Sequence, residues 1–142
     1  MSSSTSVVPA TSALLNECLE FDHVAVGGGA GRRTELSRAA DEGRMRVATV
    51  DGRAVGFAVA APWFFDAPFL ALLYVDPSMR KRKFGSLLLE DFEQAHPSRV
   101  LTSTNLSNVP MQGLLRSRLW TPCGILNGLD EGDPEIFFMK VN

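Results

Sequence analysis

Cysteine, histidine and tyrosine are scarce in this sequence, which has two cysteines, two histidines and one tyrosine among 142 residues. Cys18 and Cys123 lie far apart and match no metal-ligand spacing, so we expect free thiols in a reducing compartment and no metal site. No apolar run is long enough to span a membrane, and the Ser/Thr-rich start lacks the apolar segment of a signal peptide. The sequence therefore favours a cytoplasmic protein that is not held at a membrane.

A strong excess of charge is also missing. The net charge of −2 and an isoelectric point near 5.6 argue against a general nucleic-acid binder, because such domains are usually strongly basic. With 45% hydrophobic and 21% charged residues, the composition is that of an ordinary globular protein. We expect one domain over residues 1–142, of which residues 1–5 form a disordered, low-complexity start.

The most informative stretch runs from a strand through a basic loop into a helix. An apolar run at 69–75 predicts a strand buried on both faces, and Pro77 ends it because proline has no amide to donate. After the basic residues at 80–83, one side of the predicted helix is apolar, with Leu88, Leu89, Phe92 and Ala95. Because a helix N-terminus presents free amides and a positive dipole, this arrangement predicts a site for an anion such as a pyrophosphate.

The basic loop admits three interpretations. It is a solvated charge run, a nucleic-acid patch or a phosphate cradle, and the acidic remainder of the chain weakens the second. Its place between a buried strand and a helix start favours the third, and Gly85 would let a ligand approach the backbone closely. The Walker pattern is absent, and no strand precedes the glycine-rich run at 27–31, so we interpret that run as a flexible connection.

Cap and turn residues divide the rest of the chain into further elements. Thr11 can cap a helix that ends at Phe21, and Asp51-Gly52 predicts a hairpin turn. This order of elements is that of an α/β protein with a mixed sheet. The other predicted elements are an edge strand at 6–10, a helix at 32–42 ended by Gly43, strands at 45–50, 54–61 and 100–104, a helix that starts at Asn108 with Met111, Leu114, Leu115 and Leu119 on one face, and strands at 123–129 and 135–141.

Residues 75–88 resemble motif A of the GNAT superfamily of acyl-CoA N-acyltransferases, which has the form V-x-P-x-x-R/Q-x-x-G-x-G/A before an apolar helix. The matching positions are Val75, Pro77, Arg80 and Gly85. A second stretch is more loosely similar to the family pattern N-x-x-A-x-x-x-Y-x-x-x-G-F, at Asn108, Met111, Leu115, Leu119 and Trp120. Together with the element order, the resemblance implies a GNAT-like mixed sheet of about seven strands with helices on both faces.

The resemblance also implies a site for acetyl-CoA, as a cosubstrate, and no metal. The strand that ends at Tyr74-Val75 would diverge from the strand at 100–104, pantetheine would pair in the gap, and the amide of Val75 would polarise the thioester. The pyrophosphate would lie on the amides of residues 80–86, and a neutral amine would attack directly. The implied contact residues are Tyr74, Val75, Arg80, Lys81, Arg82, Lys83, Phe84, Gly85, Ser86, Asn108 and Leu115.

Three positions depart from the family pattern. Lys83 replaces the first motif glycine, although its side chain could contact phosphate as a point charge. Leu115 stands where many relatives have a tyrosine that protonates the leaving thiolate, and leucine cannot do this. Leu119 replaces the glycine before the final aromatic residue.

Few residues could act as acids or bases at such a site. Tyr74 is either beside the thioester or a core aromatic residue, and His23, at the end of the first helix, is either near the acceptor or on the surface. The aromatic cluster at 63–65, with Asp66, either lines the acceptor side or packs a core edge. We expect Cys123 to be a buried, inert thiol. Surface positions are expected for His96 and for the acidic residues of 130–135.

Two functions follow from these observations. The first is an N-acetyltransferase that moves an acetyl group from acetyl-CoA to an amine of a small molecule or peptide. The second, motivated by the three departures, is a non-catalytic acyl-CoA-binding or interaction module on the same fold. Neither involves nucleic acid or a membrane. Late strands in this fold often pair between subunits, so a homodimer is a further expectation.

Overall fold

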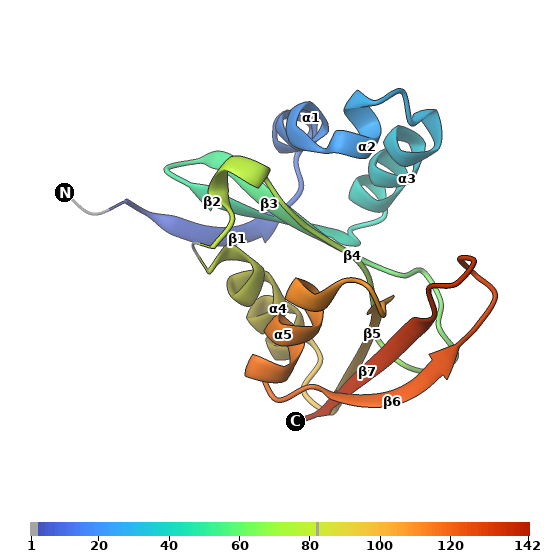
Figure 1. The fold of residues 1–142 in the computed structure, drawn as a ribbon. Helices are drawn as coiled ribbons and strands as arrows, with labels where there is room; N and C mark the ends of the chain where they lie inside the picture. Colours follow the sequence, from blue (N-terminus) through green and yellow to red (C-terminus); the bar gives the residue numbers. More distant parts are fainter. Residues whose placement is uncertain (1–2, 82) are drawn as a thin grey trace.

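The structure is a computed structural model that describes residues 3–81 and 83–142. Its elements are β1 (Thr5–Pro9), α1 (Ser12–Phe21), α2 (His23–Val26), α3 (Ala30–Asp41), β2 (Met45–Val50), β3 (Arg53–Ala60), β4 (Phe69–Val75), the 3-10 turn η1 (Pro77–Met79), α4 (Phe84–Ala95), β5 (Arg99–Asn105), α5 (Val109–Ser117), β6 (Thr121–Leu126) and β7 (Glu135–Val141). Within the described residues they form a mixed seven-stranded sheet in the order β1-β2-β3-β4-β5-β7-β6 (Figure 1). The predicted α/β class and mixed sheet are confirmed.

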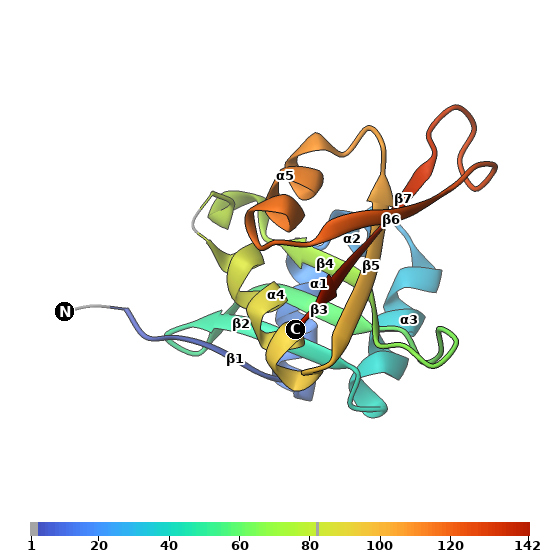
Figure 2. The same ribbon diagram turned by 90° about the horizontal axis from the view of Figure 1, so that it is seen from below.

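Helices cover both faces of this sheet (Figures 1 and 2). On one face α1 and α3 pack over a buried cluster that includes Cys18, Leu36 and Phe57. On the opposite face α4 packs over a second cluster that includes Leu88 and Ala58. Because successive side chains of a strand point to opposite faces, the neighbours Phe57 and Ala58 enter different clusters, and β3 is buried on both sides.

Local sequence signals explain where several elements begin and turn. Thr11 Oγ1 accepts a backbone hydrogen bond from the first turn of α1, and Asn108 Oδ1 accepts one from Met111 N at 3.2 Å. Asp51 and Gly52 both have positive φ, 49° and 83°, as a two-residue hairpin turn between β2 and β3 requires. The two predicted caps and the predicted hairpin are confirmed.

The start of the chain is more ordered than predicted. Strand β1 begins at Thr5 and pairs with β2. Before it, Ser4 N donates to the Asp51 carboxylate at 2.9 Å, and Asp51 N donates to Ser4 O at 2.8 Å. The expectation that residues 1–5 are disordered is therefore wrong for its last two residues, because the hairpin turn holds them.

The glycine-rich run is also more structured than predicted. A short helix, α2, precedes it, and the buried Asp22 carboxylate caps that helix by accepting from Val24 N at 3.2 Å. Helix α3 then starts at Ala30, two residues earlier than expected, so the connection is Gly27, Gly28 and Gly29. A Cβ on Gly29 would lie 2.5 Å from the Val24 carbonyl oxygen, so a glycine is needed where α3 begins.

Three predictions of burial are wrong. Ala95 is exposed because it is the last residue of α4, at the solvent end of the apolar side. Leu119 is 77% exposed because α5 ends before it and its φ of 69° turns the chain away from the helix face. Cys123 is exposed because β6 is an edge strand whose residues are all exposed.

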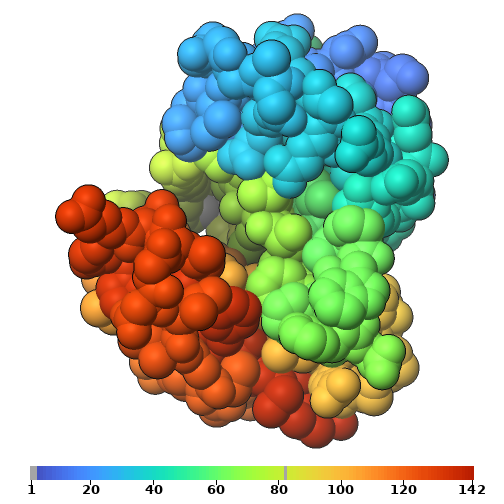
Figure 3. Space-filling view, turned by 90° about the vertical axis from the view of Figure 1, so that its right-hand side faces the viewer, coloured from blue at the N-terminus to red at the C-terminus, as the bar shows by residue number. Residues whose placement is uncertain are grey.

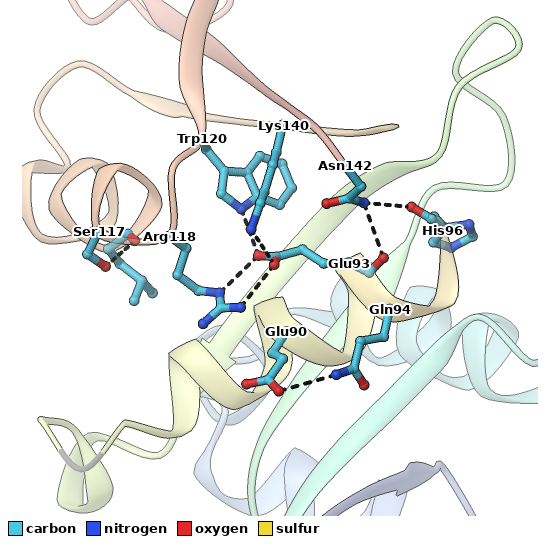
Figure 4. A network of polar contacts seen from close by, with 10 residues as sticks. Glu90, Glu93, Gln94, His96, Ser117, Arg118, Trp120, Lys140 and Asn142 are labelled. Carbon is cyan, nitrogen blue, oxygen red and sulfur yellow. Dashed lines mark hydrogen bonds and ion pairs between the residues drawn. The ribbon is translucent and has the colours of Figure 1, made fainter. Parts of the chain in front are cut away.

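A buried carboxylate connects α4 to the C-terminal elements (Figure 4). Glu93 accepts hydrogen bonds from Arg118 Nε and Nη2 at 2.9 Å, from Trp120 Nε1 at 2.9 Å and from Lys140 Nζ at 2.7 Å. Burial would raise the pKa of Glu93, but these donors outweigh it and lower the pKa to about 2. Asn142 Nδ2 donates to the Glu93 and His96 carbonyl oxygens, so the chain end is fixed to the same helix.

Candidate functional site

The sheet opens between β4 and β5. The two strands pair only at the first two residues of β4, Phe69 with Leu101 and Leu70 with Thr102, where Thr102 Oγ1 donates to Leu70 O at 2.7 Å. Beyond this junction β5 stays paired with β7 along its whole length, and β4 stays paired with β3. The described strands therefore separate after Leu70, as the family resemblance implied.

The backbone of β4 is directed into this gap at alternate residues. Asp76 N donates to Val55 O at 2.8 Å and Tyr74 lies opposite Phe57, so these residues of the β4 end bond to β3. In an antiparallel ladder the residues between them point the other way, so the amides of Leu73 and Val75 face the gap. Only Val75 was predicted for this role. Leu73 was missed because its orientation depends on the pairing register.

Strand β4 is not buried on both faces, contrary to the prediction. Leu70 is 1% exposed, but Ala71 is exposed and the following residues are half-buried. The apolar sequence suggested a central strand with two neighbours, and β4 loses its second neighbour after Leu70. The pairing with β3 also shifts at this level, from Leu72 opposite Val59 to Leu70 opposite Ala60, which leaves Ala71 as an extra residue, a β-bulge.

At the end of β4, a basic loop leads to the N-terminus of α4. Arg80 Nε donates to Val75 O at 3.2 Å, and its guanidinium lies 5.3 Å from the centre of the Tyr74 ring. Lys81 and Lys83 are exposed and both have positive φ, 66° and 69°. The first turn of α4 contains no acidic residue. Exposed cations and free helix amides thus meet at one place, which suits an anion; Arg82 lies outside the described residues.

The predicted contacts at the start of α4 separate into exposed and internal residues. Ser86 is half-buried in the first turn, whereas Phe84 is only 6% exposed and belongs to the core. A Cβ on Gly85 would lie 2.9 Å from Leu114 Cδ2, the tip of a side chain of α5, so the glycine leaves room for that side chain. This contact gives Gly85 a packing role beside the ligand approach that the sequence suggested.

In the second family-like stretch, the side chain of Leu115 does not reach the gap. That residue is completely buried in the α4-side cluster, so its side chain has no exposed surface for a ligand, contrary to the prediction. Asn108 caps α5, as described above, and is itself exposed. Where many relatives have a tyrosine, this chain thus has an aliphatic side chain that is also fully buried.

Two candidate acid–base residues lie together. His23 Nδ1 is 2.6 Å from Tyr74 Oη, although the two residues are 51 positions apart in sequence. The Tyr74 ring packs against Phe21 and Phe57, with centroid distances of 6.2 and 5.7 Å. His23 begins α2 and does not end α1, because the buried Asp22 separates the two helices. The pair lies on the α1–α3 side of the sheet. Tyr74 stands between Leu73 and Val75, whose amides face the gap.

Other candidates lie elsewhere or have other partners. Trp63 and Phe65 are 69% and 70% exposed, while Phe64 stacks on Phe69 at 4.2 Å, so the aromatic cluster only partly packs a core edge. The acidic turn is partly used to hold the loop between β5 and α5, since Asp133 accepts from Ser107 N and Oγ. Burial raises the pKa of the Cys18 thiol to about 12, which removes it as a nucleophile. In the described part of the chain, no group of three or more His, Cys, Asp or Glu side chains could hold a metal.

Comparison with known families and structures identifies the class. The profile of the acetyltransferase (GNAT) family matches residues 12–119, and the chain belongs to this family. A crystal structure of a GNAT-family acetyltransferase from Bacillus cereus shares 34% identity over 98% of both chains, with a TM-score of 0.87. Comparison with curated protein sequences gives no match.

Two more distant structures share the fold. A ribosomal-protein-alanine N-acetyltransferase from Brucella melitensis has 23% identity and a TM-score of 0.74, over 96% of this chain and 99% of that one. The structure of yncA from Salmonella typhimurium with its cofactor acetyl-CoA has 18% identity and a TM-score of 0.73, over 96% and 93% of the two chains. Among the described residues, no helix combines the length and apolar character needed to cross a membrane.

Proposed function

We propose that this protein is an N-acetyltransferase that moves the acetyl group of acetyl-CoA to an amine of a small molecule or peptide. The observation that carries the proposal is the opening of β4 from β5 directly beside a basic helix N-terminus. Membership of the GNAT family supports the use of acetyl-CoA. The buried Cys18 thiol and the scarcity of cysteine support a cytoplasmic location.

The residues around the gap fit the parts of acetyl-CoA. The pyrophosphate would lie on the α4 N-terminus, held by its amides and by the exposed Lys81 and Lys83. Pantetheine would pair with the amides of Leu73 and Val75 in the place that β5 leaves free. When bound, acetyl-CoA supplies an activated acetyl thioester.

The chain's own groups would act on that thioester in two ways. The amide of Val75 or Leu73 donates a hydrogen bond to the carbonyl oxygen as negative charge develops there. The amine nitrogen bonds to the carbonyl carbon, the carbon–sulfur bond breaks, and the proton lost by the amine is transferred to the thiolate. We propose that Tyr74 and His23 carry this proton, because Leu115 cannot and because the pair is already hydrogen-bonded.

Lys83 combines two features at the proposed pyrophosphate site. Its φ of 69° is the left-handed conformation that glycine adopts easily, so the loop keeps the backbone shape of the family pattern with a lysine in place of glycine. Its exposed ammonium group is then available to phosphate. We propose that the lysine offsets the strain of its backbone by binding the cosubstrate.

Thiol release and calorimetry test the proposal together. The protein is incubated with acetyl-CoA and a panel of amines, and free thiol is measured, while titration calorimetry measures the affinity for CoA. Lys81→Ala with Lys83→Ala should weaken CoA binding by about tenfold or more, and less at high salt. Arg99→Gln is the matched control, because Arg99 is an exposed cation that follows the other end of α4. CoA binding that ignores the lysines would contradict the proposed cosubstrate site.

A non-catalytic acyl-CoA-binding module is the second candidate, and the burial of Leu115 favours it, since the family's usual acid is missing. It shares the CoA site but lacks turnover. CoA binding with no amine-dependent thiol release from any acceptor would select this candidate over the enzyme.

A further inference from the structure

A pocket of about 720 Å³ lies beside the gap, on the α1–α3 side of the sheet. Its lining comes from α3, the residues between α3 and β2, the end of β3 and the residues that follow it, together with Ala71 of β4. Figure 3 views the right-hand side of Figure 1, with the α1–α3 layer (blue to cyan) at the top, the segment after β3 (green) at the lower right and β4 (yellow-green) between them. Pockets for small ligands typically measure about 300–1,000 Å³, so this one has the volume of a small-molecule site.

The pocket adjoins the inner end of the gap. Ala71 directly follows Leu70, the last residue of β4 that pairs with β5, and it is the extra residue of the bulge. Leu72 and Tyr74, further along β4, belong to the cluster on the same side of the sheet as α3. A molecule in the pocket would therefore approach β4 from the side opposite α4.

The charges around the pocket are not equivalent. Arg44 is already partnered, because its guanidinium contacts the Glu42 carboxylate at 2.6 Å and donates to Ala60 O at 2.7 Å. The exposed side chains of Glu35 and Arg38 also line the pocket, and among the described residues neither side chain has a hydrogen-bond or ion-pair partner. They lie three residues apart on α3, so they share one side of that helix. The pocket thus offers one carboxylate and one guanidinium to a ligand.

Several small side chains lie in the α3 wall and in the facing wall. Ala30, Gly31 and Ala61 leave the volume open, and a Cβ added to Gly31 would meet no atom within 4 Å. A guanidinium binds a carboxylate through two parallel hydrogen bonds, which makes Arg38 selective for a planar anionic group. Glu35 can accept hydrogen bonds from polar N–H or O–H groups of the same ligand.

We infer that this pocket binds the acceptor, and that the acceptor is a small amine that also carries a carboxylate. The inference rests on the proposed acetyl transfer and names the substrate class of that reaction. Arg38 holds the carboxylate, and the amine extends past Ala71 toward the thioester. There the amine nitrogen gains the acetyl carbon, the carbon–sulfur bond breaks, and the thiolate takes the proton that the nitrogen loses.

Matched acceptors and matched arginines test the assignment. The probes are L-alanine, L-glutamate, L-phenylalanine and L-lysine, each compared with its own carboxamide, with acetyl-CoA as donor. We expect the acids to be used at least tenfold better by kcat/KM than the amides. Arg38→Gln should raise the KM for the acids about tenfold and leave the KM for acetyl-CoA and for the amides unchanged. Arg33→Gln is the control, because Arg33 is an exposed arginine of α3 outside the pocket lining.

A second variant fills the pocket without removing a charge. Gly31→Leu places a side chain in open space and replaces a helical glycine by a better helix former, so folding should be preserved or improved. It should lower kcat/KM for the acids at least tenfold while CoA affinity, measured by calorimetry, stays constant. Proton NMR line broadening of each acid by the CoA-bound protein gives a binding readout that needs no turnover.

The outcomes separate this inference from the proposed function. Loss of CoA binding in the unaltered protein would contradict the proposed function itself. If CoA binds but acids and amides behave alike, or if Arg38→Gln and Gly31→Leu leave acid use and acid binding unchanged, the pocket assignment alone is overturned. Absence of binding of all four acids to the CoA-bound protein overturns it in the same way.

Discussion

The polar groups around Glu93, near the C-terminal end of α4, differ from those at the N-terminus of the same helix in how they are partnered. Around Glu93, every charged group is partnered, the carboxylate is 6% exposed, and three elements are held together. At the N-terminus of the same helix, cations are exposed and backbone conformations are strained. Full pairing of buried charge supports stability, whereas exposed and strained groups are the ones that remain free to bind a ligand.

Glu93→Gln should give the largest loss of stability. The substitution leaves Arg118 and Lys140 without their carboxylate and places an amide among three donors, so we expect a loss of roughly 3–5 kcal/mol. The measurement is the urea unfolding midpoint. Glu90→Gln is the matched control, because Glu90 lies on the exposed side of α4, and its loss should be small. Equal losses in both variants would remove the contrast between the two regions.

Lowering the pH should destabilise the fold through protonation of the Glu93 carboxylate. The folded-state pKa of Glu93 is lowered from its ordinary value of 4.5 to about 2. A depressed pKa means that its contribution is complete above about pH 4.5 and is lost as the pH falls toward 2, by about 3 kcal/mol in total. Urea midpoints at pH 6, 4 and 2.5 measure this loss. The Glu93→Gln variant should lose less over this range, and a parallel decline in both proteins would contradict the assignment.

Tyr74→Phe should lower catalytic activity with little loss of stability. Removing Oη takes away the partner of His23 but keeps the ring against Phe21 and Phe57, so the free energy of unfolding should change by only about 1 kcal/mol. We expect kcat to fall about a hundredfold, with CoA affinity unchanged. A shift in the pH dependence of kcat in His23→Gln would support a shared proton path. Unaltered kcat in both variants would exclude the pair from proton transfer.

Several local features of the fold could be predicted from the sequence because they depend only on residues close together in the chain. The Thr11 and Asn108 caps and the Asp51-Gly52 turn need only local hydrogen bonds and φ values. The opening of β4 from β5 came from the family pattern. The family pattern was misleading at Leu115, which it implied as a ligand contact, whereas the helical spacing of apolar residues correctly placed it on a buried face.

The long-range pairings could not be predicted in this way. No local signal singles out Glu93, because its partners Arg118 and Lys140 lie 25 and 47 positions away. His23 and Tyr74 were both candidates, but nothing in the sequence indicated that they meet. The register that turns Leu73 toward the gap is likewise a property of the paired sheet.

Two residues with left-handed backbone conformations stand where the family pattern has glycine. Replacing each with glycine should have the smallest effects and should separate a ligand contact from backbone strain alone. Lys83 and Leu119 both have φ of 69°, so replacing either with glycine should relieve about 1 kcal/mol of strain, less the entropy gained by the unfolded chain. Thermal unfolding should show similar small effects. Only Lys83→Gly should weaken CoA binding, by roughly three- to tenfold. Equal CoA affinities would assign Lys83 no role in phosphate binding.

The central claim is that acetyl-CoA occupies the gap between β4 and β5 and the N-terminus of α4. Backbone amide NMR on titration with CoA tests it most directly. We predict the largest shifts at Leu73, Val75, Lys83 and Ser86, with Glu93 and Trp120 little changed. Shifts confined to other parts of the chain, or none at millimolar CoA, would contradict the account.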